Sequence, residues 1–90
     1  MKREYNLECV YDNHKSFYGK AVVKVVESVS KTLYSYNTKV AQITYENGEK
    51  TLKIFGFYSS TTLRHIKEFV QQEGFPAMNK KQLSEYEVTK

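Results

Sequence analysis

The chain has 90 residues and a net charge of +4, and it contains eight Tyr, five Phe and no Trp. This length suits one domain, since domains rarely fall below about 50 residues, and it excludes a barrel enzyme or a doubly wound nucleotide-binding fold. Hydrophobic residues make up 40% and charged residues 27%, which is typical of a globular chain. We expect residues 1–90 to form one domain, with its core over residues 5–75 and a C-terminal appendage over residues 76–90.

Two strands are predicted in the first third of the chain. Residues 5–11 alternate between apolar and polar side chains, as a half-buried strand does. Residues 20–26 are β-branched and apolar, which favours a central strand. The segment between them, residues 12–16, is rich in turn-forming residues, and residues 28–32 are predicted as a polar break.

The next signal is a hairpin centred on Asn47-Gly48. β-rich runs over residues 33–45 and 50–58 flank it, and Asn-Gly tolerates positive φ at both central positions, as a two-residue type I′ turn requires. Such a turn fixes the register of the two strands. The predicted opposite pairs are Ile43 with Leu52, Ala41 with Ile54, Val40 with Phe55 and Thr38 with Phe57.

A helix is predicted from about residue 59 to Gly74. Ser59 or Ser60 suits the N-cap, because its hydroxyl can accept a hydrogen bond from an amide of the first turn. Apolar residues then recur at helical spacing, and Gly74 suits the left-handed position that ends a helix, where Phe75 would meet Val70. The apolar stripe consists of Leu63, Ile66, Phe69 and Val70.

Residues 79–82 resemble a capping box with Asn79 as the cap and Gln82 as its partner. This pattern predicts a short second helix. Together the elements predict an α+β fold: a small antiparallel sheet of three to four strands, including the Asn-Gly hairpin, packed by one main helix.

The sequence lacks the parts of a catalytic or metal site. A single cysteine, Cys9, excludes an internal disulfide and a multi-thiolate zinc site, and it lies on the apolar face of its strand, where a thiol acts as a small hydrophobe. His14 and His65 have no further ligands at metal-binding spacing, and His65 is expected to bond to the sheet. No phosphate loop or nucleophile elbow is present. We therefore expect no enzyme activity, no metal and no cofactor.

Localisation is predicted from the same features. One unpaired cysteine fits a reducing cytoplasm. The first residues are polar rather than an apolar signal segment, and no apolar run approaches the ~20 residues of a membrane span.

Positive charge is concentrated in the middle of the chain. Residues 15–67 hold nine basic and three acidic side chains, whereas the flanks hold five basic and seven acidic ones. A basic segment can attract nucleic acid or an acidic partner. Lys also serves simply to solvate a surface, and only two of the fourteen basic residues are Arg, so both interpretations stay open. The candidate basic surface consists of Lys20, Lys24, Lys39, Lys53, Arg64 and Lys67.

Four aromatic side chains are predicted to share one sheet face: Tyr34, Tyr36, Phe55 and Phe57. Residues 53–58 partly match the aromatic strand of the RNA-recognition motif, although the order of elements differs from that fold. Such a face could stack nucleic-acid bases, or it could pack under the helix or in a dimer. If the helix covers the opposite face, an exposed aromatic cluster would mark an interface.

Two segments and a helix ending carry a resemblance to other proteins. The segments are residues 33–41 (Leu-Tyr-Ser-Tyr-Asn-Thr-Lys-Val-Ala) and residues 58–69 (Tyr-Ser-Ser-Thr-Thr-Leu-Arg-His-Ile-Lys-Glu-Phe), and the ending is Gln72, Gly74 and Phe75. They resemble a group of small uncharacterised proteins of phages and mobile elements of Gram-positive bacteria. The resemblance covers residues 33–75. It implies a cytoplasmic setting in a bacterial host and brings no activity or site residues.

The two resembling segments are expected to meet at one polar corner of the fold. The helix N-terminus there favours an anion, whereas caps and Asx turns use the same residue types for structure. Both interpretations stay open. The corner candidates are Asn37, Thr38, Thr61, Thr62 and His65.

We expect a non-enzymatic binding protein that targets a host protein or ribonucleoprotein, including inhibition of a CRISPR-type defence nuclease. The charge of +4 has the wrong sign for an acidic DNA mimic. The alternatives are a nucleic-acid-binding module, which would use the Lys-rich surface and the sheet aromatics, and a homodimeric accessory protein.

Overall fold

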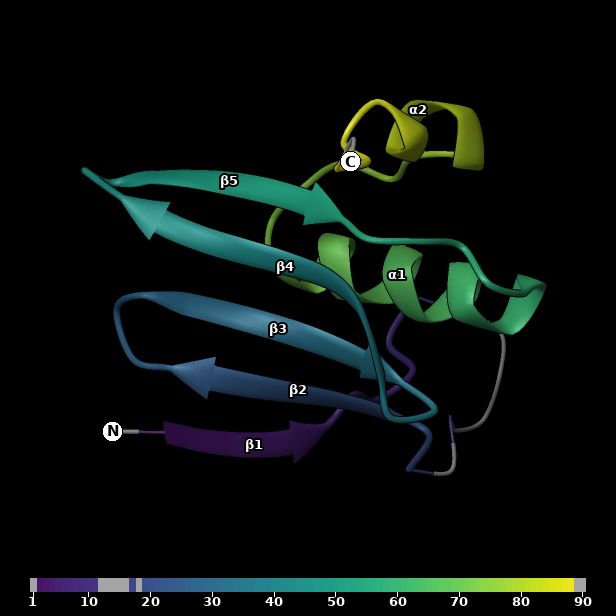
Figure 1. Cartoon of the computed structure of the whole chain (residues 1–90), viewed down its shortest axis with the longest axis horizontal. Helices are drawn as coiled ribbons and strands as arrows, with labels where there is room; N and C mark the ends of the chain where they lie inside the picture. Colours follow the sequence, from purple (N-terminus) through teal and green to yellow (C-terminus); the bar gives the residue numbers. More distant parts are fainter. Residues whose placement is uncertain (1, 12–16, 18, 89–90) are drawn as a thin grey trace.

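Five strands form one antiparallel sheet in the computed structural model, which describes residues 2–11, 17 and 19–88 (Figure 1). Their order in the sheet is their order in the chain, so every neighbouring pair is joined by a connection between consecutive strands. The strands are β1 (Lys2–Asn6), β2 (Ala21–Val26), β3 (Ser30–Ser35), β4 (Thr38–Glu46) and β5 (Glu49–Ile54). The predicted α+β class is confirmed, with five strands rather than three to four.

The additional strand comes from a turn that the pattern of β-rich residues did not reveal. Tyr36 and Asn37 have φ values of 52° and 69° and divide the run predicted over residues 33–45 into β3 and β4. Positive φ is common for Asn but unusual for Tyr, so Tyr36-Asn37 does not predict a turn in the way that Asn47-Gly48 does. β3 begins at Ser30, inside the predicted polar break.

The hairpin between β4 and β5 is confirmed. Asn47 and Gly48 have φ values of 51° and 81°. In the register, Ile43 lies opposite Leu52 and Ala41 lies opposite Ile54. The ladder ends at Ile54, so the predicted pairing of Thr38 with Phe57 does not extend it.

A β-bulge lies between β3 and β4, where the register shifts between Leu33 and Tyr34. Leu33 faces Ala41, but Tyr34 faces Lys39, so Val40 is the extra residue. Val40 and Ala41 are both fully buried although they are adjacent. The predicted pairing of Val40 with Phe55 keeps one backbone hydrogen bond, from the Phe55 amide to the Val40 carbonyl oxygen at 2.8 Å, but the Val40 side chain is fully buried whereas Phe55 is half-buried.

The main helix, α1 (Ser60–Gln72), has the predicted ends. Ser59 is the N-cap, and its Oγ accepts a hydrogen bond from the Thr62 amide at 3.1 Å. At the other end Gly74 has a φ of 95°, and the Phe75 amide donates to the Val70 carbonyl oxygen at 3.0 Å. These bonds satisfy backbone groups that a helix end would otherwise leave without partners.

α1 covers the sheet face that carries Ile43, Leu52 and Ile54 (Figure 1). Burial there removes apolar side chains of the helix and the sheet from water together, which is the main stabilising term of the fold. The fully buried core also includes Ile66, Phe69, Val70, Val23 and Leu33.

The second helix, α2 (Lys80–Ser84), lies beside β5 (Figure 1). Its predicted capping box is confirmed, with both Asn79–Gln82 hydrogen bonds present at 2.8 and 2.9 Å. Leu83 is fully buried in the core. After α2, the Tyr86 carbonyl oxygen accepts from the Ile54 amide and the Val88 amide donates to the Ile54 carbonyl oxygen, both at 2.9 Å. The C-terminal segment therefore docks along the end of β5.

The first strand is shifted from its prediction. β1 ends at Asn6, and Leu7 enters the core, whereas residues 8–11 leave the sheet and contact α1. The Tyr11 amide donates to Glu68 Oε1 at 2.9 Å, and Gln72 Nε2 donates to the Glu8 carbonyl oxygen at 2.7 Å. These contacts compete with strand pairing, which a local alternation pattern cannot show. The predicted turn over residues 12–16 and His14 lie outside the described residues.

Neither described helix is long and apolar enough to cross a bilayer.

Candidate functional site

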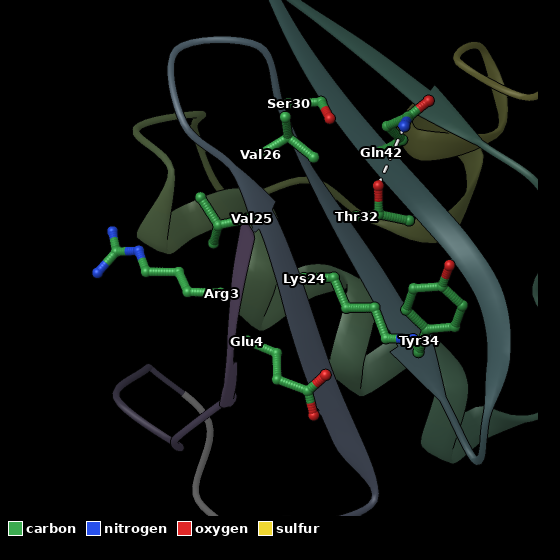
Figure 2. Close-up of a pocket in the computed structure, with 9 residues that line it drawn as sticks. All are labelled: Arg3, Glu4, Lys24, Val25, Val26, Ser30, Thr32, Tyr34 and Gln42. Atoms are coloured by element: carbon green, nitrogen blue, oxygen red, sulfur yellow. Dashed lines mark hydrogen bonds between the residues drawn. The ribbon is translucent and has the colours of Figure 1, made fainter. Parts of the chain in front are cut away.

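The candidate site is the sheet face opposite α1, which we call the open face. A groove of about 600 Å³ runs over it, and Figure 2 shows the residues that line it, mostly from β2 and β3, with others from β1 and β4. Ser30 and Thr32 point to this face and yet are only 7% and 8% exposed. A twisted sheet with a bulge curves more strongly than a regular one, so we attribute the low exposure to a hollowed surface.

A row of alternating lysines and aromatic rings crosses the open face. Lys24 Nζ of β2 lies 4.6 Å from the centre of the Tyr34 ring of β3. Tyr34 faces Lys39 of β4, and Lys39 Nζ lies 4.8 Å from the centre of the Phe55 ring, directly after β5. We call Lys24, Tyr34, Lys39 and Phe55 the lysine–aromatic row. Each ammonium is attracted to the negative face of its neighbouring ring.

The floor of the groove is polar. Gln42 Nε2 donates a hydrogen bond to Thr32 Oγ1 at 3.0 Å (Figure 2), and Ser30 lies beside them. Hydroxyl and amide groups of this kind can donate and accept hydrogen bonds. The open face is therefore unlike the apolar sheet faces that pack against a second layer in a β-sandwich.

Charge on the open face is mainly positive near the row. Lys53 faces Gln42 in the register and is exposed. Glu4 lines the groove from β1, and Glu46 and Glu49 lie at the tip of the β4–β5 hairpin. Arg3 pairs with Glu27 at 2.7 Å and points away from the groove (Figure 2). The positive strip thus runs from β2 to β5, with carboxylates beyond it.

A family model described as a family of unknown function (DUF8033) matches residues 5–85. The chain belongs to this family. The matched region contains the whole lysine–aromatic row, both helices and the segments on which the resemblance over residues 33–75 rested. No curated protein and no solved structure matches the chain significantly.

In this DUF8033 domain the four predicted aromatic candidates do not share one face, so that prediction is wrong for two of them. Tyr34 and Phe55 belong to the row. Tyr36 lies in the β3–β4 turn, with its ring 5.9 Å from that of His65. Phe57 follows the end of β5 and packs against the core, with Lys80 Nζ 5.7 Å from its ring centre. Side chains alternate regularly between the two faces only within the strands, so Tyr36 and Phe57, which lie beyond the ends of β3 and β5, do not share the face of Tyr34 and Phe55.

The predicted polar corner is a buried hydrogen-bond network. Ser35 Oγ lies 2.8 Å from His65 Nδ1 and 3.1 Å from Thr62 Oγ1. His65 is 1% exposed, and the Phe17 ring meets it edge-on at 4.5 Å. The expectation that His65 bonds to the sheet is confirmed. These contacts join β3 to α1, which is a structural task.

The other corner candidates are not part of this network. Thr61 is half-buried, and Asn37 and Thr38 are exposed in and after the β3–β4 turn. The network includes a residue that sequence reasoning did not select, Ser35. The one sequence signal for Ser35 was that it lies in the Ser-Tyr part of residues 33–41, the first resembling segment.

A second polar cluster, centred on Glu73, lies on the covered face and was not predicted. Lys31 Nζ contacts both Glu73 carboxylate oxygens at 2.9 Å, and the Tyr45 hydroxyl donates to Glu73 Oε1 at 2.9 Å. Lys50 Nζ donates to the Glu73 carbonyl oxygen at the end of α1. The cluster ties β3, β4 and β5 to the helix end, where positive charge is favourable.

This cluster shifts the ionisation of its members. Burial alone would lower the pKa of Lys31, but the hydrogen bond and negative charge of Glu73 raise it above 10.5. Burial and the hydrogen bond to Glu73 raise the pKa of Tyr45 above 10.0. Burial also raises the pKa of Tyr5. All three shifts favour the form that holds its proton.

The candidate basic residues also divide between the open face and other parts of the molecule. Lys24, Lys39 and Lys53 lie on the open face. Lys20 Nζ lies 5.5 Å from the ring centre of Tyr36, in the β3–β4 turn, and Arg64 and Lys67 belong to α1. Among residues 2–11, 17 and 19–88, no three His, Cys, Asp or Glu side chains come together as a metal site would require.

Proposed function

We propose that this protein is a non-enzymatic binding module that docks on a macromolecule of a Gram-positive host through its open face. The observation that carries the proposal is the lysine–aromatic row, which places two cations and two rings side by side, with Lys24 and Tyr34 at the groove. Aromatic side chains are enriched where proteins bind partners, and the two lysines add positive charge that attracts an acidic partner.

The polar groups outside the open face support a binding role over a catalytic one. Ser35, Thr62 and His65 are buried and bonded to one another, so they are closed to a substrate. In the described part of the chain, no buried side-chain nitrogen or oxygen lacks a hydrogen-bond partner. Catalytic groups usually sit in a cleft with access to the substrate, and these do not.

We further propose that the protein belongs to a phage or mobile element and acts in the cytoplasm of its host against a defence ribonucleoprotein. The resemblance over residues 33–75 and the small size support this setting. Inhibition of a CRISPR-type nuclease would be measured as survival of a targeted plasmid in cells that express the protein. The role is contradicted if survival does not rise with any effector in a Gram-positive panel.

The binding proposal is tested by capture from a Gram-positive lysate. The protein, a Lys24→Gln/Lys39→Gln variant and a Lys80→Gln/Lys81→Gln control are immobilised at equal density. Both variants lose two positive charges, but the control loses both on α2, away from the groove. We expect the wild type and the control to retain the same macromolecule and the row variant to lose it. Equal capture by the row variant would contradict the proposal.

A further inference from the structure

We propose that the occupant of the open face is a single-stranded nucleic acid that crosses the sheet from β2 to β5. Its bases would stack on Tyr34 and Phe55, and its phosphates would contact Lys24, Lys39 and Lys53. This inference rests on the proposed function in one respect, which is that the open face is the binding surface.

The alternation of charge and ring is the first argument. A single strand exposes both of its chemistries, phosphates and base faces, at a regular interval, and proteins bind it with a positive groove and aromatic stacking platforms. A duplex stacks its bases on each other and presents mainly phosphates. An acidic protein could also contact lysines and rings, but it does not present negative charges and flat rings in regular alternation. The row supplies both groups in alternation.

The size of the surface is the second argument. Neighbouring strands lie about 4.8 Å apart, so the row spans roughly 14 Å between β2 and β5. The groove beside it has a volume of about 600 Å³. This space suits a short segment of one strand. Glu4, which lines the groove from β1, repels phosphates and disfavours extension of the strand toward β1.

The third argument is that the row can exchange its internal contacts for nucleic-acid contacts. Each lysine ammonium now lies near a ring. An exposed cation–π contact is weaker than a base stacked on the same ring, and the freed ammonium then reaches a phosphate. Thr32 and Gln42 are bonded to each other and can turn to base edges without leaving a buried polar group unsatisfied.

The test is fluorescence anisotropy with labelled oligo-dT and oligo-U of about 12 nucleotides, within the range of single-strand sites. Salt is varied from about 50 to about 200 mM, because phosphate contacts release counterions. Three contacting lysines predict a slope of log affinity against log salt of about −2. Binding of the DNA probe, the RNA probe or both supports the inference and identifies the source of the strand.

Matched variants separate stacking from charge. Tyr34→Leu and Phe55→Leu keep an apolar side chain and remove the ring, and each should weaken binding by roughly tenfold. Lys24→Gln and Lys39→Gln should each reduce the steepness of the salt slope by about 0.7. Lys80→Gln/Lys81→Gln should change neither quantity. Circular dichroism and thermal melting establish that each variant is folded.

Four results would overturn the inference: no binding of either oligonucleotide at low salt, undiminished binding by both leucine variants, equal affinity for a duplex of the same length, or binding of polyglutamate in place of the oligonucleotides. If nuclease-treated lysate still yields a partner through the open face, this inference fails and the proposed function stands. If oligonucleotides bind but the row variant retains lysate capture, the proposed function fails instead.

Discussion

The two faces of the sheet use charge in different ways. On the covered face, Lys31 contacts the Glu73 carboxylate, which also accepts from Tyr45. On the open face, Lys24 and Lys39 contact aromatic rings. An ion pair that bridges a helix and a sheet is part of the folded structure, whereas an exposed lysine on a ring of the open face can leave it for another partner. The comparison indicates that the covered face holds the fold together and the open face is available for binding.

The largest expected difference between the faces is in stability, and two adjacent residues of β4 test it. Ile43 is fully buried against α1, whereas Thr44 lies on the open face. Ile43→Ala should lower the free energy of unfolding by about 2–5 kcal/mol, because it leaves a cavity. Thr44→Ala should change it by about 0.5 kcal/mol or less. Urea unfolding measures both, and similar losses would break the comparison.

The next largest effect concerns the charged groups. Glu73→Gln removes the carboxylate that Lys31 and Tyr45 share, and it should cost about 2 kcal/mol because Lys31 is partly buried. Lys24→Gln, which removes a charge from the open face, should cost about 0.5 kcal/mol or less. The same urea experiment applies. If Lys24→Gln were the more destabilising, the row would have a structural role that we do not assign to it.

The smallest effect is a dependence of stability on alkaline pH. The folded state raises the pKa of Tyr45 above 10.0 and that of Lys31 above 10.5. A group with a raised pKa stabilises the fold at pH values below its unfolded pKa, and this contribution is lost as pH rises through the folded pKa. The melting temperature should therefore fall from about pH 10 upward.

Two variants locate the source of that decline. Tyr45→Phe removes one of the shifted groups from the covered face and should make the decline shallower. Tyr34→Phe removes a hydroxyl from the open face and should leave the profile as in the wild type. Thermal melts across alkaline buffers measure both, and a profile that is unchanged in Tyr45→Phe would assign the decline to other groups.

Parts of the fold with local signals could be predicted from the sequence. Asn47-Gly48 specifies a turn and hence the β4–β5 register. Ser59 and Gly74 specify the two ends of α1. Each signal depends on the backbone preference of one or two residues, so it acts whatever surrounds it.

The remaining features depend on contacts between distant segments. Tyr36 takes a positive φ that its own preference disfavours. β1 ends early because Glu68, in α1, holds the amide of Tyr11. The Glu73 cluster joins residues from four elements or their ends. The open-face site was predictable in its residue types, because Tyr34, Phe55 and the three lysines were candidates, but their alternation follows from a bulge that no local pattern indicates.

Because of that bulge, the number of residues in β4 matters as well as their identity. Side chains alternate along a strand, so a shift of one residue exchanges the two faces. If β4 ran without the bulge, Val40 would face Tyr34 and Lys39 would turn from the open face to the covered face, although every member of the row would still be present in the sequence. The segment between the two Asn turns, at Asn37 and Asn47, should therefore accept many substitutions on its open side but few insertions or deletions.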